Sequence, residues 1–377
     1  MKIGLLINPI AGMGGRVGLK GTDGVVDEAR RRGAKPIAPL RASEFLETLK
    51  DLLKVSNFPK VSFVTCPGPM GADCVQTAEF AMDIVEASID SETSADDTRL
   101  CTLALYEAGV RLLVFVGGDG TARDILDAVN EHELDGLLVI GVPSGVKMYS
   151  GIFVINPRDA AEVIRLMLQG AATSAEFEIM DADEAAFRED RFIIQLYGYL
   201  RGPSVPARFQ GAKQASPETI DEAEAQEAIA RFVIDEMIPD GVYILGPGTT
   251  VKTVAVLLNI KKTTLGVDVY TSTSVLNDVN ETSLMETVKD PSKTWVIVSP
   301  IGHQGMLFGR GNQQISPKII DLVGKDHVTV ISTPAKLRGI EDGTLKVDTG
   351  QESTDEMLRG YIRVITDYNE IRLVKVE

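Results

Sequence analysis

One stretch constrains the fold of this chain more than any other: Leu112–Asp124, with the sequence LLVFVGGDGTARD. Five apolar residues run directly into a glycine turn, and Ala122–Val129 can continue as a helix. Such a pattern predicts a buried parallel strand, a tight turn and a helix N-terminus. A helix N-terminus attracts anions, because its unpaired N–H groups and its dipole point at the turn. The carboxylate of Asp119 is unexpected there, and it requires contact with a hydroxyl, a metal or a proton.

The rest of the first half repeats this alternation of strand and helix. Further apolar strands are expected at Lys2–Ile7, Val61–Thr65 and Leu137–Val142. Strands that are apolar on both faces indicate a parallel sheet covered by helices on both sides. We therefore predict an α/β protein whose N-terminal domain is a doubly wound parallel sheet. Because ligands of such sheets bind outside the carboxyl ends of the strands, the turns that follow the four strands are expected to converge.

The length of 377 residues predicts two domains, since single hydrophobic cores stop growing before that size. We place the first at residues 1–156, as a nucleotide- and phosphate-binding domain, and the second at residues 157–377, as a substrate domain. The second half mixes helices and strands and predicts a β-rich mixed α/β domain. A hairpin is expected from Tyr361–Thr366 and Ile371–Val376, and whether these last strands pack back toward the first domain is open.

Composition excludes several classes of partner. The net charge of −16 argues against binding to nucleic acid or to an anionic membrane surface, because phosphate contacts need clustered Lys and Arg. No apolar stretch approaches the length of about 20 residues that spans a bilayer. Three irregularly spaced cysteines suit a reducing compartment, and the first residues lack the features of a signal peptide. We expect a cytoplasmic protein, with no metal site formed by a cluster of its own side chains.

Two glycine turns are candidate phosphate sites on their own pattern. The first, Asn8–Gly15, has glycines that allow close approach of the backbone to a ligand, and it contains the candidates Asn8, Gly14 and Gly15. The second follows an expected strand at Val242–Leu245 and contains Gly248 and Thr249. For each turn, phosphate binding and an ordinary tight connection to the next helix are about equally supported.

The usual catalytic signatures are absent from the sequence. We find no GxxxxGK[ST], no complete GxGxxG, no GxSxG and no HExxH. What is present, glycine turns with one carboxylate and nearby Thr, Asn and Lys, suits phosphoryl transfer, which depends on positioning and on a base near the acceptor hydroxyl. Asp119 would then deprotonate that hydroxyl, although an Asp that caps the following helix is the alternative.

At these residues the chain resembles the superfamily of NAD kinases, diacylglycerol kinases and sphingosine kinases. Gly117–Thr121, GGDGT, is similar to the central motif of that superfamily, and Asn8–Gly15 is similar to its N-terminal NPxAGxGG loop. Within it, the chain most resembles the predicted ATP-NAD kinase branch that includes AcoX-like proteins. Further stretches carry the likeness to this branch: Gly141–Ser150, Gly246–Thr250 with Leu265–Asp268, and Pro300–Gln314.

The resemblance implies a site between the two domains and transfer of a phosphate from ATP or polyphosphate, with a divalent cation such as Mg²⁺, to the 2′-hydroxyl of NAD. It implies a homo-oligomer, a dimer or a tetramer. It assigns Asp119 as the base and a pair, Asn280 and Glu281, as contacts of the substrate nucleoside. It also assigns a phosphate-contacting turn, which consists of Gly117, Gly118, Gly120 and Thr121.

One turn departs from the pattern of the well-studied NAD kinases. They carry a GxNxGxLGF-like turn where this chain has Gly141–Met148, GVPSGVKM. Ser144 and Lys147 are candidate substrate contacts there, and a solvated Lys147 is equally supported. The turn leaves the acceptor open: NAD, another small hydroxyl compound, or a lipid, which the net charge disfavours. A nucleotide-binding accessory protein without the chemistry is the alternative from another class.

Overall fold

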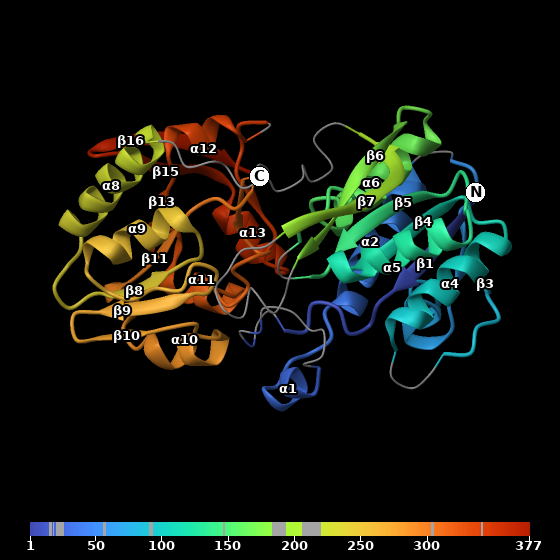
Figure 1. The fold of residues 1–377 in the computed structure, drawn as a ribbon, viewed down its shortest axis with the longest axis horizontal. Helices are drawn as coiled ribbons and strands as arrows, with labels where there is room; N and C mark the ends of the chain where they lie inside the picture. Colours follow the sequence, from blue (N-terminus) through green and yellow to red (C-terminus); the bar gives the residue numbers. More distant parts are fainter. Residues whose placement is uncertain are drawn as a thin grey trace. The chain divides into compact units, whose positions relative to one another are not determined.

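A computed structural model of the chain describes residues 1–14, 17, 19, 26–55, 58–89, 93–145, 148–182, 194–205, 220–302, 305–340 and 342–377. These residues form two compact units, one built from the elements up to β7 and the other from α8 onward (Figure 1). None of the described helices combines the length and the apolar character needed to cross a membrane.

The sheet of the first unit has the order β3-β2-β1-β4-β5, and all of its strand pairs are parallel. Its strands are β1 (Lys2–Ile7), β2 (Ser62–Thr65), β3 (Met82–Ile84), β4 (Leu112–Gly117) and β5 (Leu138–Pro143). The helices of this unit are α1 (Val26–Arg31), α2 (Ala38–Val55), α3 (Ala72–Thr77), α4 (Ala95–Glu107), α5 (Asp119–Glu131) and α6 (Pro157–Leu168).

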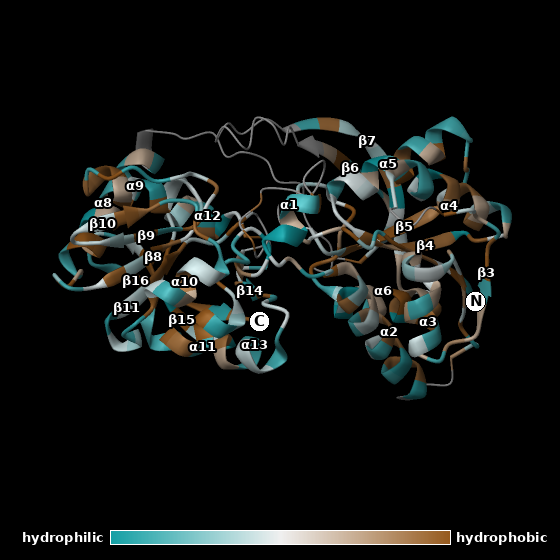
Figure 2. Ribbon diagram, turned by 90° about the horizontal axis from the view of Figure 1, so that it is seen from below, coloured by the Kyte–Doolittle hydropathy of each residue, from teal (hydrophilic) through white to brown (hydrophobic). Residues whose placement is uncertain are grey.

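Apolar side chains project from both faces of this sheet. Along β4, Leu112, Val114 and Val116 pack with residues of α2, α3 and α6, whereas Leu113 and Phe115 pack with residues of α4 and α5. All five of these side chains are at most 2% exposed. The predicted doubly wound parallel sheet is therefore confirmed, and the strands carry the strongest hydrophobic colour of the unit (Figure 2).

A long antiparallel pair, β6 (Thr173–Ala182) and β7 (Ile194–Ser204), also belongs to the first unit. It covers the α5 face of the sheet, where Ile179 and Leu200 join the core. A Cβ on Gly202 would lie 2.5 Å from the carbonyl oxygen of Val139, so β7 can approach β5 only through a glycine. Together with α6, this pair carries the first unit well past residue 156, because its apolar residues complete the first core rather than the second.

The sheet of the second unit has the order β10-β9-β8-β11-β13-β15-β16. Its strands are β8 (Val242–Leu245), β9 (Asp268–Thr271), β10 (Ser274–Leu276), β11 (Thr294–Val298), β13 (Val328–Ile331), β15 (Gly360–Asp367) and β16 (Glu370–Val376). The strands β8, β11, β13 and β15 run parallel, and the other pairs are antiparallel. The last two strands form the expected hairpin, and their hydrogen bonds place them within this second sheet.

Helices cover both faces of the second sheet as well. They are α8 (Ile220–Asp235), α9 (Thr249–Leu257), α10 (Glu281–Thr287), α11 (Pro317–Val323), α12 (Pro334–Arg338) and α13 (Glu352–Leu358). Residues of α8 and α9 form one core with Tyr243, Leu245 and Ile297, while residues of α10, α11 and α13 form another on the opposite side of the strands. The described residues also form a short parallel pair, β12 (Met306–Phe308) and β14 (Lys346–Val347), and the 3-10 turns Gly68–Met70, Pro291–Lys293 and Lys325–His327.

Candidate active site

Asp119 is the first residue of α5, directly after the buried strand β4 and the N-cap residue Gly118. Its carboxylate accepts two backbone hydrogen bonds: the N–H of Tyr149 lies 2.7 Å from Oδ2, and the N–H of Ser150 lies 3.0 Å from Oδ1. These donors and the helix N-terminus stabilise the negative charge. The sequence analysis requires a contact for this carboxylate. The backbone N–H groups of Tyr149 and Ser150, about 30 residues downstream, supply two.

The loop after β1 is attached to the turn after β4. The amide Nδ2 of Asn8 donates to the hydroxyl of Thr121 at 2.9 Å, and the backbone N–H of Asn8 donates to the carbonyl of Val116 at 2.9 Å. A Cβ on Gly117 would lie 2.5 Å from the Thr121 hydroxyl oxygen, so the turn can close on Thr121 only with glycine at this position. Asn8, Gly117 and Thr121 are thus in one cluster.

The turn after β5 joins the same cluster. The N–H of Ser144 donates to the carbonyl of Gly117 at 3.0 Å. Gly12 has a φ of +79°, and a Cβ there would lie only 1.8 Å from the carbonyl oxygen of Ser144. The Cα of Gly145 would lie 3.7 Å from a Cβ on Gly118. Three strand-end turns therefore meet, and glycine backbone forms most of the contact, as expected where a ligand approaches closely.

The fourth turn, after β2, has contacts of a different kind. Gly71 lies against the side chain of Thr65, whose hydroxyl donates to the carbonyl of Leu5 at 2.8 Å. Cys66 and Cys101 are buried, and a hydrogen bond between the two thiols, together with burial, raises the pKa of Cys66 well above its ordinary value. The Cys66 thiol is therefore protonated, and the two buried cysteines act as packing residues. Among the described residues there is no group of three His, Cys, Asp or Glu side chains placed to hold a metal ion.

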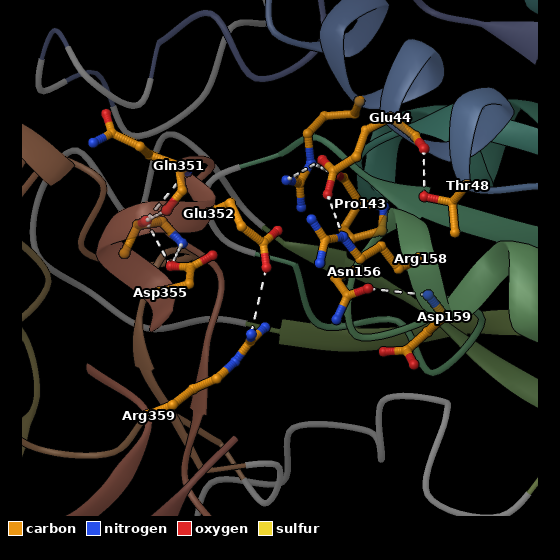
Figure 3. Close-up of polar contacts among 12 residues, drawn as sticks. Glu44, Thr48, Pro143, Asn156, Arg158, Asp159, Gln351, Glu352, Asp355 and Arg359 are labelled. Carbon is orange, nitrogen blue, oxygen red and sulfur yellow. Dashed lines mark hydrogen bonds and ion pairs between the residues drawn. The ribbon is translucent and has the colours of Figure 1, made fainter. Parts of the chain in front are cut away.

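Charged side chains of α2 and α6 hold the end of β5, where the turn begins. Arg41 of α2 is 8% exposed and donates through Nε to the carbonyl of Pro143 at 3.2 Å. Glu44 lies between two arginines, 3.3 Å from Arg41 and 3.6 Å from Arg158 of α6. Figure 3 shows Glu44 and Arg158 close to Pro143, together with the Asn156 side chain that caps α6 by accepting the N–H of Asp159. The group fixes the turn where the sequence departs from the NAD kinase pattern.

Two buried hydroxyls lie in the segment that follows. Ser144 is 2% exposed, and its Oγ has no hydrogen-bond partner in the part of the chain that the structure describes. A buried hydroxyl without a partner costs about 1–3 kcal/mol, so a ligand that bonds to it gains affinity. Tyr149 is also 2% exposed, and burial, with a smaller effect of the Asp119 charge, raises the pKa of its phenol. Tyr149 therefore remains protonated and cannot act as the base.

The glycine turn of the second unit joins a strand to a helix as the sequence predicts, but one of its N–H groups is already hydrogen-bonded within the protein. Gly248, with a φ of +113°, is the N-cap of α9, and its N–H donates to the carbonyl of Thr264 at 2.8 Å. Thr249 is exposed at the first position of the helix. This turn can still offer the following N–H groups to an anion.

The remaining candidates have structural roles or lie outside the described residues. Asn280 caps α10 by accepting the N–H of Ser283 at 2.9 Å, and Glu281 lies 3.9 Å from the ammonium of Lys318. The carbonyl of Gly14 accepts the N–H of Leu19. Gly15 and Lys147 lie outside the described residues. Contacts of these residues with a ligand stay predictions.

Sequence reasoning missed the backbone donors of Tyr149 and Ser150 and the support from Arg41 and Glu44. Backbone donors leave no trace in residue type, so no motif could have revealed the first pair. Arg41 and Glu44 are one helical turn apart on α2, a spacing that is common on solvated helix faces. Only the burial of Arg41 distinguishes this pair from an ordinary surface pair.

Comparison with known families assigns both halves of the chain. The family model described as the ATP-NAD kinase N-terminal domain matches residues 3–172, and the model described as the ATP-NAD kinase C-terminal domain matches residues 238–376. No curated protein matches the chain at the significance required. The first match extends through α6, in agreement with the extent of the first unit beyond residue 156.

Proposed function

Because the chain belongs to the ATP-NAD kinase family, we propose that it transfers a phosphate from ATP or polyphosphate to the 2′-hydroxyl of NAD, giving NADP, with Asp119 as the base. The observation that carries this proposal is the position of Asp119 at the meeting point of three glycine turns, with its carboxylate oriented by two backbone N–H groups. A kinase needs this combination of phosphate-binding backbone and one positioned carboxylate.

The proposed step moves one proton and one phosphoryl group. Asp119 takes the proton of the acceptor hydroxyl while the hydroxyl oxygen forms a bond to the terminal phosphorus of the donor. The bond from that phosphorus to the bridging oxygen breaks, and its electron pair leaves with ADP or with the shortened polyphosphate. The backbone around Gly117, Gly118 and Gly120 would contact phosphate oxygens, and Thr121, held by Asn8, would keep the turn in shape.

A divalent cation implied by the family would neutralise phosphate charge in this reaction. Mg²⁺ is commonly held by one or two carboxylates together with substrate phosphates. The described residues, which offer Asp119 but no cluster of three ligating side chains, fit an ion that is carried mainly by the donor phosphates.

Ser144 is the residue of the unusual turn that we propose as a substrate contact, because its buried hydroxyl lies between the glycine turns without a partner among the described residues. Gly14, Gly15, Lys147, Gly248, Thr249, Asn280 and Glu281 are further proposed ligand contacts. We also propose that the protein is cytoplasmic and forms a homo-oligomer, a dimer or a tetramer. Sedimentation of the purified protein would test the oligomeric state.

The test is an acceptor screen with the purified protein and Mg²⁺. ATP or polyphosphate is offered with NAD, NADH, a small polyol or diacylglycerol vesicles, and the phosphorylated product is identified. We expect NADP from NAD. Phosphorylation of a different acceptor without NADP would replace NAD in the proposal, and nucleotide binding without any transfer would make the chain an accessory binding protein.

A further inference from the structure

A lysine of the second unit has an unusual orientation. Lys336 of α12 keeps part of its surface in solvent, yet its Nζ is turned inward and donates to the hydroxyl of Ser299 at 2.9 Å. Lysines near a surface normally do the opposite, burying the stem and leaving the ammonium in water. Desolvation of the ammonium lowers the pKa of Lys336 to about 8, against the smaller opposite effect of Glu222. An inward ammonium is costly unless something compensates for it.

The compensation inside the protein is incomplete. An ammonium carries three donors, and Ser299 accepts from one of them. Lys336 forms no ion pair within the described ranges. The carboxylate of Glu222, on α8, accepts the hydroxyl of Thr333 at 2.7 Å and acts on Lys336 only through its charge. The hydroxyl of Ser299, 2% exposed, has its own proton to donate. The Lys336 ammonium and the Ser299 hydroxyl thus bring unused donors to this point, while the nearby Glu222 carboxylate is hydrogen-bonded to Thr333.

The position of these donors in the sheet is that of a ligand site. Ser299 directly follows β11, and Thr333 and Lys336 follow the neighbouring parallel strand β13. The turn after β8 lies alongside, since the N–H of Gly246 donates to the carbonyl of Ile297 at 2.8 Å. Beyond β8 the chain passes to α9 on one face of the sheet, and beyond β11 it passes to α11 on the other. Ligands of open α/β sheets bind at carboxyl ends where connections diverge in this way.

We propose that Lys336 and Ser299 form a phosphate-binding site at the carboxyl ends of β8, β11 and β13, next to the N-terminus of α9. The ammonium and the Ser299 hydroxyl donate to oxygens of a phosphate group, inorganic or part of a small phosphorylated molecule, and the first N–H groups of α9 add favourable dipoles. Binding here does not require the transfer proposed for Asp119. Thr333 and Glu222 are positioning residues, because they hold the start of α12 from which Lys336 extends.

The experiment measures the number of inorganic phosphate ions bound by the full chain, using equilibrium dialysis with labelled phosphate. The variants are Lys336→Met, Ser299→Ala and Asp119→Asn. Lys325→Met serves as a control that removes a positive charge from the same unit, where Lys325 donates to the carbonyls of Leu358 and Arg359. Acetate competes in parallel, to separate a phosphate site from a general site for carboxylates.

We expect Lys336→Met to lose one bound phosphate per chain, or to bind it about 10–100-fold more weakly, as for loss of a charge-assisted hydrogen bond. Ser299→Ala should weaken the same phosphate, and Lys325→Met and Asp119→Asn should leave it unchanged. If Lys336→Met does not fold, as judged by circular dichroism, Ser299→Ala decides. Three results would overturn the proposal. The first is equal phosphate binding by the wild type and by Ser299→Ala or a folded Lys336→Met. The others are a wild type that binds no phosphate and displacement of the bound phosphate by equimolar acetate.

Discussion

Among the described residues of the site, few side chains have polar groups near the proposed reaction centre. Asp119 is oriented by backbone N–H groups, Gly12 and Gly117 give their neighbours room, and Ser144 contributes a hydroxyl without a partner in the described chain. Backbone N–H groups bind phosphate oxygens irrespective of residue type, so specificity for the acceptor has to come from side chains. Within the described part of the site, the buried hydroxyl of Ser144 is the candidate.

Ser144→Ala separates a ligand contact from a structural role. The side chain is buried without a partner in the described part of the chain, so its removal should leave the free energy of unfolding unchanged or raise it by up to about 1 kcal/mol. The KM for the acceptor should rise about 5–10-fold, as for loss of one neutral hydrogen bond. Urea unfolding and steady-state kinetics measure the two effects. A drop in stability with an unchanged KM would make Ser144 a packing residue.

The titration of Lys336 gives a pH dependence of stability. Its pKa is about 8 in the folded chain and near 10.5 when unfolded, so between these values the unfolded state binds more protons and stability rises with pH. The full gain is about 3 kcal/mol, and it is absent below pH 8, where both states are protonated. Urea unfolding at pH 7.5 and pH 10 in phosphate-free buffer should show this gain in the wild type but not in Lys336→Met. The same change of the free energy of unfolding with pH in both proteins would rule out Lys336 as its source.

At the scale of elements, the sequence predicted what local patterns determine. The strands at Lys2–Ile7 and Val242–Leu245 are found with the expected bounds. The strand Met82–Ile84 was missed because three residues with an exposed Asp83 have no detectable period. The contact between Asp119 and Tyr149 could not be predicted, because it depends on how two turns 30 residues apart meet in space.

The meeting of the turns depends on a glycine, and a matched pair of substitutions tests this. Gly12 and Gly33 have φ values of +79° and +81°, but only at Gly12 would a Cβ collide, 1.8 Å from the carbonyl oxygen of Ser144; at Gly33 nothing lies within 4 Å. Gly33→Ala should cost about 1 kcal/mol for the backbone conformation alone. Gly12→Ala should cost at least about 2 kcal/mol more, or shift the turn and abolish activity. Equal costs with full activity would show that this contact is not needed.

At the scale of the molecule, the chain consists of two units, each with its own sheet and with apolar cores on both faces of that sheet. Length indicated two domains, but the boundary at residue 156 came from local pattern alone. The structure assigns α6, β6 and β7 to the first unit, because their apolar side chains complete its core. Which core an element packs against depends on the folded chain, so a short stretch of sequence gives little indication of it.

Separate cores predict separate stability. Leu113→Ala removes a fully buried side chain from the first unit, and Ile297→Ala removes one that is 1% exposed from the second, each at a cost of about 2–5 kcal/mol. Hydrogen exchange should accelerate in β1, β4 and β5 for the first variant and in β8, β11 and β13 for the second. Acceleration in both sheets by either substitution would instead indicate one cooperative unit.

The most direct test of the account concerns the carboxylate of Asp119. The measurement is the rate of NADP formation by Asp119→Asn, which keeps the size of the side chain, beside Asp124→Asn, which changes another carboxylate of α5 that pairs with Arg99 at 3.5 Å. We predict that kcat falls about 10²–10⁴-fold in Asp119→Asn, with the KM values little changed, while Asp124→Asn keeps near wild-type activity. Equal rates of NADP formation by the wild type and Asp119→Asn would contradict the central claim.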